Sequence, residues 1–282
     1  MHRLKEAPET PETIVIKPQR GWLRIDFKEL WAYRELFWLL ALRDVLVRYK
    51  QAVIGIIWAL IQPISTMVVF SVVFGGLAKL PSDGIPYPIM VFTALLPWQF
   101  FASATGASCQ SVVGKGSILT KIYFPRLIIP ASAVISGMID FAISFVILLV
   151  MMLWFHIIPT VNIIFLPLFL LLVFITALGI GLWLSALNVE FRDVAYAVPF
   201  LIQAGQYISP VAYSTSVVPE KWIFLYSLNP MVGVINGFRW SILGTATLDW
   251  ESLLFSSLAV LVLFISGLFY FRKTERTFAD II

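Results

Sequence analysis

The stretch SALNVEFRDVAYAVPF, residues 185–200, joins two long apolar runs and places Glu190, Arg192 and Asp193 within four positions between them. Charged side chains are costly inside a bilayer and are tolerated at its surface, so this pattern is typical of a short loop between two membrane-spanning helices. The chain of 282 residues is 60% hydrophobic and 13% charged, whereas soluble domains carry about 25% charged residues. We therefore interpret the sequence as an integral membrane protein.

Six apolar segments are long enough to cross a bilayer, which takes about 20 helical residues. They cover roughly residues 52–77, 87–110, 127–155, 162–187, 194–213 and 252–271. A further run, WIFLYSLNPMVGVINGFRWSILG at 222–244, is a poor span. Pro230 interrupts helical hydrogen bonding, and Arg239 costs about 2.5–3.5 kcal/mol at mid-bilayer on insertion scales. We expect residues 214–244 to form a broken, re-entrant helix pair in the outer leaflet, covered by protein or water.

The distribution of the 20 Lys and Arg residues favours six spans over seven, because cytosolic loops are enriched in Lys and Arg. With six spans and a cytosolic N-terminus, only Lys79, Lys221 and Arg239 fall outside. A seventh span would also move the basic residues at 272–276 outside. The predicted fold is an all-α integral membrane protein with six transmembrane helices and both termini in the cytosol. Its spanning domain covers residues 51–272, followed by a cytosolic tail at 273–282.

The segment before the first span divides into two parts. Residues 1–27 are polar and rich in Pro and Glu, which predicts a flexible cytosolic lead without the apolar core of a signal peptide. Residues 28–50, KELWAYRELFWLLALRDVLVRYK, contain no uncharged run longer than Leu36–Leu42, which is too short to cross. We predict an amphipathic helix at the membrane surface, anchored by Trp31 and Trp38; the alternative is an ordinary solvated helix.

The sequence offers no catalytic or metal-binding pattern. Cys109 is the only cysteine, and His2 and His156 are far apart, so neither a disulfide within the chain nor a ligand cluster is indicated. The fragment VVGKGS at 112–117 lacks the glycine and the hydroxyl residue that a phosphate-binding loop requires. No paired carboxylates suggest acid–base chemistry. We expect no enzymatic activity, cofactor or metal on this chain.

One ionisable residue, Asp140, lies midway along the third span. An intramembrane carboxylate is a candidate functional residue, but a lone one makes a poor ion relay. We favour a helix-packing role, in which Asp140 pairs with a Ser, a Tyr or a backbone group.

Polar and aromatic residues recur at helical spacing in two spans. They are Trp58, Gln62 and Ser65 in the first span and Tyr196, Phe200, Gln203 and Tyr207 in the fifth. Amides bind sugar hydroxyls and aromatic rings contact the apolar faces of sugars, so these faces suit a sugar passage; packing within one helix bundle is the equal alternative. In the fourth span, the small residues Ala177, Gly181 and Ser185 predict close helix packing.

The first cytosolic loop, GKGSILTKIYFPRLIIP at 114–130, begins with two glycines, continues with a helix-like stretch and ends near Pro125. A simple turn does not need Ile118, Leu119, Ile122 and Tyr123 facing the cytosol. Exposed apolar side chains flanked by charge predict docking onto another protein.

Six stretches of the sequence together point to a known family. They are LRDVLVRYKQAVIGIIWALIQP (42–63), LLPWQFF (95–101), LTKIYFPRLIIP (119–130), LSALNVEFRDV (184–194), SPVAY (209–213) and LNPMVGVINGFRW (228–240). In this order they resemble the permease subunit of type-2 ABC exporters, in particular the branch that exports lipid-linked polysaccharides such as O-antigen, teichoic acid and capsule. The resemblance covers about residues 30–272 and leaves the N-terminal lead without an assigned role.

This resemblance implies a bacterial inner-membrane assembly of two permeases with two ABC ATPase subunits, which hold the ATP and Mg. The loop at 114–126 matches the main coupling helix, and residues 188–193 match a second contact with the ATPase, whose side the surface helix at 28–43 would brace. The coupling residues so implied are Ser117, Ile118, Leu119, Lys121, Ile122, Tyr123, Glu190, Arg192 and Asp193.

The implied substrate is a polysaccharide on a polyprenyl pyrophosphate, which passes through a channel between the two permeases. The first and fifth spans would line this channel, and residues 214–244 would cap its outer mouth. Arg43, Arg48 and Lys50 would attract the pyrophosphate head group, or they simply follow the positive-inside rule. Membrane lipids are expected partners, and nucleic acids are not.

Three other functions compete with this interpretation. The same fold could export a drug or a lipid, which predicts an apolar cavity instead of amides and aromatic rings. An ion-coupled secondary carrier predicts mid-membrane ion ligands in two related halves. A membrane glycosyltransferase predicts a catalytic carboxylate in a loop, and the acids at 83, 220, 249 and 251 show no paired pattern.

Overall fold

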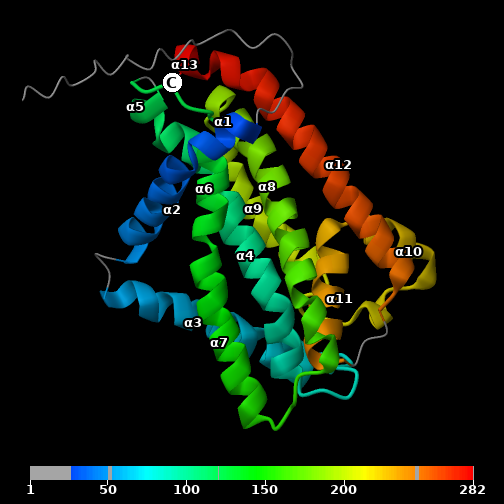
Figure 1. Cartoon of the computed structure of the whole chain (residues 1–282). Helices are drawn as coiled ribbons and strands as arrows, with labels where there is room; N and C mark the ends of the chain where they lie inside the picture. The colour runs from blue at the N-terminus through cyan, green and yellow to red at the C-terminus, as the bar shows by residue number, and fades with distance from the viewer. Residues whose placement is uncertain (1–26, 50–52, 120, 245–247, 282) are drawn as a thin grey trace, which may run out of the picture.

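The computed structural model describes residues 27–49, 53–119, 121–244 and 248–281, and it contains only helices and loops over these ranges (Figure 1). The helices are α1 (Phe27–Ala32), α2 (Arg34–Tyr49), α3 (Val53–Phe70), the π-helix η1 (Ser71–Leu77), α4 (Tyr87–Gly114), α5 (Gly116–Leu119), α6 (Ile128–Ser136), α7 (Met138–Trp154), η2 (Val161–Phe165), α8 (Leu166–Glu190), α9 (Val194–Ile208), η3 (Thr215–Val217), α10 (Glu220–Ser227), α11 (Pro230–Leu243), α12 (Trp250–Thr274), η4 (Glu275–Thr277) and α13 (Phe278–Ile281).

Five helical stretches are long and apolar enough to cross a membrane, within the described residues. They are Leu60–Leu77, Tyr87–Gly114, Ile128–Trp154, Val161–Glu190 and Trp250–Thr277. Each coincides with one of the expected spans. The remaining expected span, residues 194–213, is shorter than predicted, because α9 ends at Ile208 after 15 residues. The following Ser209-Pro210 pair explains the early end, since proline has no N–H to continue the helical ladder.

Helix α4 forms the centre of the bundle, and most of its length is buried. It packs against α6, α7, α8 and α11 (Figure 1). A helix that is apolar on every side is stable only when other helices or lipid surround it, and α4 has Leu95 and Phe100 buried on different faces. The position of α4 therefore follows from its sequence.

Two helix contacts around α8 depend on small residues. An added Cβ at Gly179 would lie 2.7 Å from the Phe264 Cα of α12, and one at Gly181 would lie 2.5 Å from the Ser108 Oγ of α4. Ala177 and Ser185 are fully buried on the same helix. The close packing predicted from Ala177, Gly181 and Ser185 is confirmed.

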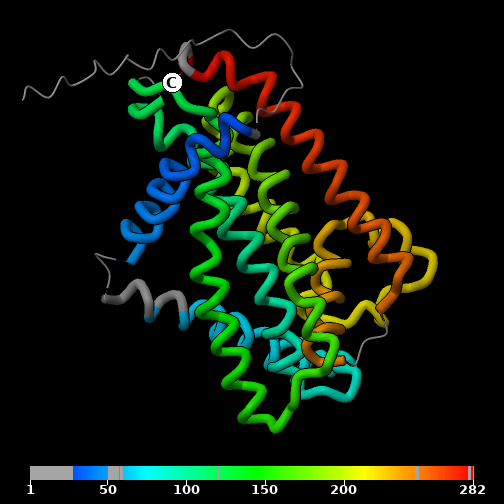
Figure 2. Tube along the Cα trace, viewed as in Figure 1, coloured from blue at the N-terminus to red at the C-terminus, as the bar shows by residue number. Residues whose placement is uncertain are grey.

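Helix α3 is oriented differently from the other long helices. Figures 1 and 2 show it running across the bundle at a steep angle to α4 and α7, while α2 runs beside α6. Helix α2 thus brings its C-terminal end to the beginning of α7. The surface position predicted for residues 28–50 stays a prediction.

A second apolar cluster lies at the end of the bundle where α1, α5 and α13 meet (Figure 1). Leu40 of α2, Leu119 of α5, Val189 of α8 and Phe278 of α13 are all buried in it. Apolar burial of this kind holds the two loops at residues 115–127 and 190–194 to the same end of the molecule.

Within the predicted segment 214–244, α10 and α11 are two helices separated by a break at Leu228 and Asn229; the re-entrant position of this pair in the outer leaflet stays a prediction. Helix α10 ends before Asn229, whose side chain accepts a hydrogen bond from the Met231 N–H at 3.0 Å, and Pro230 begins α11. Asparagine at the N-cap and proline at the first helical position are favoured at helix starts. The pair packs against the first part of α12, away from α5 and α13 (Figure 1).

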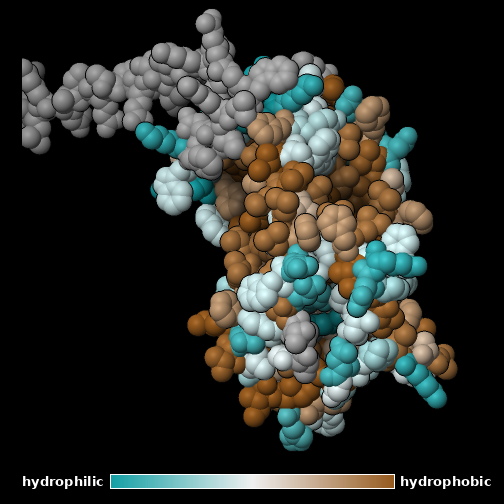
Figure 3. Space-filling model, turned by 90° about the vertical axis from the view of Figure 1, so that its right-hand side faces the viewer, coloured by the Kyte–Doolittle hydropathy of each residue, from teal (hydrophilic) through white to brown (hydrophobic). Residues whose placement is uncertain are grey.

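The outer surface carries a broad apolar belt. Figure 3 shows this belt in the upper half of the face that carries α12, with polar residues above it and a mixed polar region below. Leu254, Leu258 and Ile265 of α12 are exposed. Contiguous apolar surface of this extent suits contact with lipid.

Candidate functional site

A cavity of about 560 Å³ opens between the C-terminal end of α2 and helices α3, α4, α7 and α9. Its walls are mixed, with apolar residues such as Phe100 and Ile202 beside several polar groups. The polar side chains that line it are Arg48, Tyr49, Gln62, Gln99, Ser103, Gln110, Asp140 and Ser144. Pockets that combine apolar walls with a few polar groups are the usual form of ligand sites.

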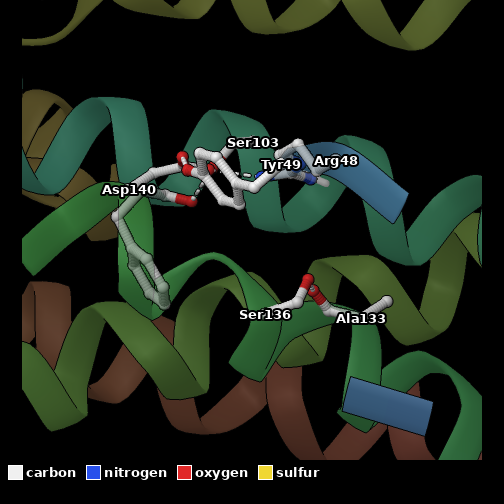
Figure 4. Close-up of polar contacts among 7 residues, drawn as sticks. Arg48, Tyr49, Ser103, Ala133, Ser136 and Asp140 are labelled. Atoms are coloured by element: carbon white, nitrogen blue, oxygen red, sulfur yellow. Dashed lines mark hydrogen bonds and ion pairs between the residues drawn. The ribbon is translucent and has the colours of Figure 1, made fainter. Parts of the chain in front are cut away.

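An ion pair closes one side of this cavity. The Arg48 guanidinium donates to one carboxylate oxygen of Asp140, and the Tyr49 hydroxyl donates to the other (Figure 4). Asp140 lies in the first turn of α7, just after the break at Gly137 that separates α6 from α7. The tyrosine pairing predicted as one option for Asp140 is confirmed, and the arginine is an additional partner.

The residues predicted to face a sugar passage are exposed where their side chains are described. Gln62 and Ser65 are exposed on α3, and Tyr196, Phe200, Gln203 and Tyr207 are exposed on α9. These side chains are not buried within the chain's own bundle, and both their part in a passage and the packing alternative stay predictions. The side chain of Trp58 lies outside the described residues.

Helices α3 and α9 approach each other near their C-terminal ends. The rings of Phe70, at the end of α3, and Tyr207, near the end of α9, have their centroids 6.0 Å apart. Of the predicted passage residues, Gln62 alone also lines the cavity within the described part of the chain. The passage face and the cavity thus adjoin at α3.

The first loop carries the short helix α5, which is shorter than the helix-like stretch of the sequence. Ser117, Lys121, Ile122 and Tyr123 are exposed, and Ile118 is half-buried. Leu119 is buried in the cluster with Phe278, so its predicted exposure to the cytosol is wrong. Apolar packing of Leu119 fixes the loop to the bundle, while Ile122 and Tyr123 remain open to a partner.

Tyr123 also connects this loop to the N-terminal helices. Its hydroxyl donates to the Glu29 Oε1 of α1 at 3.3 Å. Burial, and after it the neighbouring Glu29 carboxylate, raise the pKa of Tyr123. The hydroxyl is therefore protonated at neutral pH and available as a donor.

The second loop presents its charges to solvent. Helix α8 ends at Glu190 and α9 begins at Val194, so Arg192 and Asp193 lie in the connection. All three charged residues are exposed, and so is Phe191 between them. Phe191 was not among the residues singled out from the sequence, although an apolar residue flanked by charges was the signal used for the first loop.

The three basic residues predicted to attract a pyrophosphate occupy different surroundings. Arg43 is exposed, Arg48 is held by Asp140, and Lys50 lies outside the described residues. Within the described part of the chain, no group of three or more His, Cys, Asp or Glu side chains is placed to hold a metal ion.

Comparison with protein families adds the decisive observation. Residues 35–243, from α2 to the end of α11, match the model of the ABC-2 type transporter family.

This chain belongs to the ABC-2 type transporter family.

Individual relatives of this ABC-2 transporter chain extend the match over nearly its full length. The O-antigen export system permease protein RfbA of Myxococcus xanthus is 27% identical over 256 residues, which cover 90% of this chain and 97% of the relative. A protein of the same name from Klebsiella pneumoniae is 27% identical over 85% of this chain and 92% of its own length. The polysialic acid transport protein KpsM of Escherichia coli is 22% identical over 84% of this chain and 92% of its own length.

The family and the apolar helices together make this ABC-2 chain a multi-pass inner-membrane protein. The residues matched by the family model include those that line the cavity, the cluster of Arg48, Tyr49 and Asp140, and both loops. Sequence reasoning also missed an ion pair of this ABC-2 chain, in which the Lys115 Nζ at the end of α4 lies 2.6 Å from the Asp44 Oδ2 of α2. No sequence spacing signals it, because the partners lie 71 positions apart.

Proposed function

We propose that this chain is the transmembrane subunit of an ATP-driven exporter that moves a lipid-linked polysaccharide across the bacterial inner membrane. The cargo would be an O-antigen, a teichoic acid or a capsule-like polymer on a polyprenyl pyrophosphate. The observation that carries the proposal is the match of nearly the whole chain to permeases named for O-antigen export and polysialic acid transport.

The proposed topology has six spans, a re-entrant pair before the last span and both termini in the cytosol. Residues 194–213 would cross as α9 together with the non-helical segment that follows it. Such irregular backbone is tolerated at membrane depth where protein covers it, and Val211 and Ala212 are buried. The positions of α1 and α13 at one end of the bundle support a common side for the termini.

The proposed assembly contains two copies of the chain and two ABC ATPase subunits, which would hold the ATP and Mg. The exposed faces of α3 and α9 support pairing of two permeases around a passage, because the exposed side-chain amides of Gln62 and Gln203 are costly toward lipid. The exposed Ile122, Tyr123 and Arg192 support a docking surface for the ATPase at the cytosolic end.

The proposal is tested in the source bacterium by deleting the gene and measuring polysaccharide at the cell surface. We expect the polymer to disappear from the surface and to accumulate on its lipid carrier inside the cell. Expression of the chain should restore export only together with an ATPase subunit that hydrolyses ATP. Unchanged surface polymer in the deletion strain, or transport by the purified chain without any ATPase, would refute the proposal.

A further inference from the structure

Arg48, Tyr49 and Asp140, the Asp140 cluster, lie at a depth that an anionic head group would cross if the proposed function holds. Asp140 is close to the middle of the candidate span Ile128–Trp154. An unpaired charge at this depth is unfavourable, and intramembrane Arg and Asp residues therefore pair with each other or face a polar cavity. Arg48 and Asp140 do both.

The ion pair is accessible from the cavity. The side chain of Arg48 is 38% exposed and that of Asp140 is 25% exposed, so a ligand in the cavity can reach the guanidinium. Asp140 has both carboxylate oxygens engaged, one by Arg48 and one by Tyr49. Loss of Arg48 to another anion would leave Asp140 with the Tyr49 hydroxyl as a donor.

The cavity also contains groups that suit the sugar next to such an anion. The side-chain amides of Gln62, Gln99 and Gln110 line it and make no hydrogen bond within the described part of the chain. Amides both donate and accept, as sugar hydroxyls require. Ring atoms of Phe100 and Phe141 supply apolar wall beside them.

We propose that Asp140 is a built-in counter-anion, which neutralises Arg48 in the empty cavity and is displaced from it when the pyrophosphate of the lipid carrier binds. A pyrophosphate carries more negative charge than a carboxylate and accepts two parallel hydrogen bonds from a guanidinium. Arg48 thus remains compensated before and after binding, first by Asp140 and then by the ligand. The inference rests on the proposed function, because that function supplies a pyrophosphate lipid.

Replacement of Asp140 distinguishes two roles for this residue. If Asp140 competes with the ligand for Arg48, its loss tightens ligand binding; if Asp140 supports the ligand site, its loss weakens binding. The full-length chain is reconstituted in nanodiscs of uncharged lipid, and binding of undecaprenyl pyrophosphate is measured. We expect Asp140→Asn to bind about two- to fivefold more tightly than the unmodified chain, the range of a half-exposed ion pair. Unchanged or weaker binding would overturn the proposal. If Asp140→Asn does not accumulate, Asp140→Ser carries the same expectation.

Two control variants exclude simpler causes. Glu251→Asn removes an exposed carboxylate in the first turn of α12, outside the cavity lining, and should leave the affinity unchanged. A gain equal to that of Asp140→Asn would indicate a general charge effect and overturn the proposal. Arg48→Ala should weaken binding at least about fivefold by loss of a charge-assisted contact, and unchanged binding would equally overturn it.

Two further ligands test which anionic compound the cavity recognises. Phosphatidylglycerol and inorganic pyrophosphate are tested in place of the polyprenyl compound. We expect clear binding of undecaprenyl pyrophosphate and weaker binding of both others; equal binding of phosphatidylglycerol would identify a general anionic lipid site and overturn the proposal. Failure of the unmodified chain to support export would instead count against the proposed function, which the binding assay does not use.

Discussion

Arg239 shows how a single charged residue holds α11 to α4 and to the segment after α9. It is 5% exposed, and its guanidinium donates to the backbone carbonyls of Tyr213 at 3.0 Å, Val211 at 3.1 Å and Met90 at 3.4 Å. These carbonyls belong to α4 and to the non-helical segment after α9, where the helical ladder leaves acceptors unused. Arg239 of α11 therefore connects its own helix to α4 and to the segment after α9, which lie far apart in the sequence.

We expect Arg239→Met to lower the free energy of unfolding by about 1–3 kcal/mol, because the carbonyls lose their donor while remaining buried. Thermal unfolding of the purified protein measures the change. Lys221→Met, which removes an exposed cation from the same region, is the matched control and should leave the unfolding temperature unchanged. Equal stability of both variants would show that Arg239 does not fasten these elements.

Individual glycines allow the backbones of α8 and α12 to pack closely. An added Cβ at Gly179 would lie 2.7 Å from the Phe264 Cα, and one at Gly267 would lie 2.3 Å from the Gly179 carbonyl oxygen. We expect Gly179→Ala to lower the free energy of unfolding by about 1–3 kcal/mol, because the two backbones have to separate. Gly106→Ala, whose Cβ meets no heavy atom within 4 Å, should not destabilise the protein in the same thermal assay.

At the scale of elements, α2 connects the first loop, which carries α5, with the cavity. Asp44 pairs with Lys115, directly before α5, and Arg48 pairs with Asp140 one helical turn further along. Residues four positions apart lie on the same face of a helix, so both ion pairs fasten one face of α2 to the bundle. A displacement of α5 would therefore be transmitted to the side of the cavity.

Breaking the first of these pairs should loosen α2. We expect Lys115→Ala to lower the free energy of unfolding by about 2–3 kcal/mol, somewhat less than for a fully buried pair, because it leaves Asp44 unpaired. The exchanged pair Asp44→Lys with Lys115→Asp should recover part of the loss. Thermal unfolding of the single and double variants measures this; additive losses would show that the two side chains do not interact in the folded protein.

The connection between α8 and α9 provides the second prediction at this scale. Arg192 is exposed and lies between Glu190 and Asp193. We expect Arg192→Glu to weaken co-purification of the ATPase subunit about tenfold, because a reversed charge at a complementary contact is strongly unfavourable. The fold should be unaffected. Arg276→Glu, also exposed at this end, is the control, and undiminished binding by Arg192→Glu would exclude the contact.

At the scale of the whole molecule, one copy leaves a polar and aromatic face of α3 and α9 uncovered. Tyr196 is 83% exposed and Phe200 is 71% exposed on α9, beside exposed amides on the same helix and on α3. In the proposed dimer, a second copy would cover this face and protect it from lipid. The enclosed space between two copies would then carry the polymer.

We expect Phe200→Ala to reduce surface polysaccharide by about threefold or more, since one lost ring contact is worth about 0.7 kcal/mol or more. Stability should change little, because the ring contributes little to the core. Tyr207→Ala should act in the same way. Leu201→Ala removes a neighbouring exposed side chain from a different side of α9 and serves as the control; equal export by all variants would remove this face from the passage.

Much of the fold was predictable because apolar length and charge placement are local properties of the chain. The five long candidate spans, the break before Pro230 and the small-residue packing on α8 all follow from residues close in sequence. The length of α9 was overestimated, because residues 209–213 are apolar enough to enter a membrane but leave the helix at Ser209-Pro210. Hydropathy measures transfer into lipid and does not measure backbone conformation.

The sequence by itself therefore determined that the chain is a helical membrane protein, where most of its helices lie and which loops carry charge. Only the tertiary structure decided that Arg48 and Tyr49 meet Asp140, that Lys115 meets Asp44, and that Leu119 is buried while Ile122 is not. The physical reason is that these contacts join residues far apart in sequence. Their formation depends on how α2 packs beside α6, a packing set by the fit of apolar surfaces and carrying no signature in either segment alone.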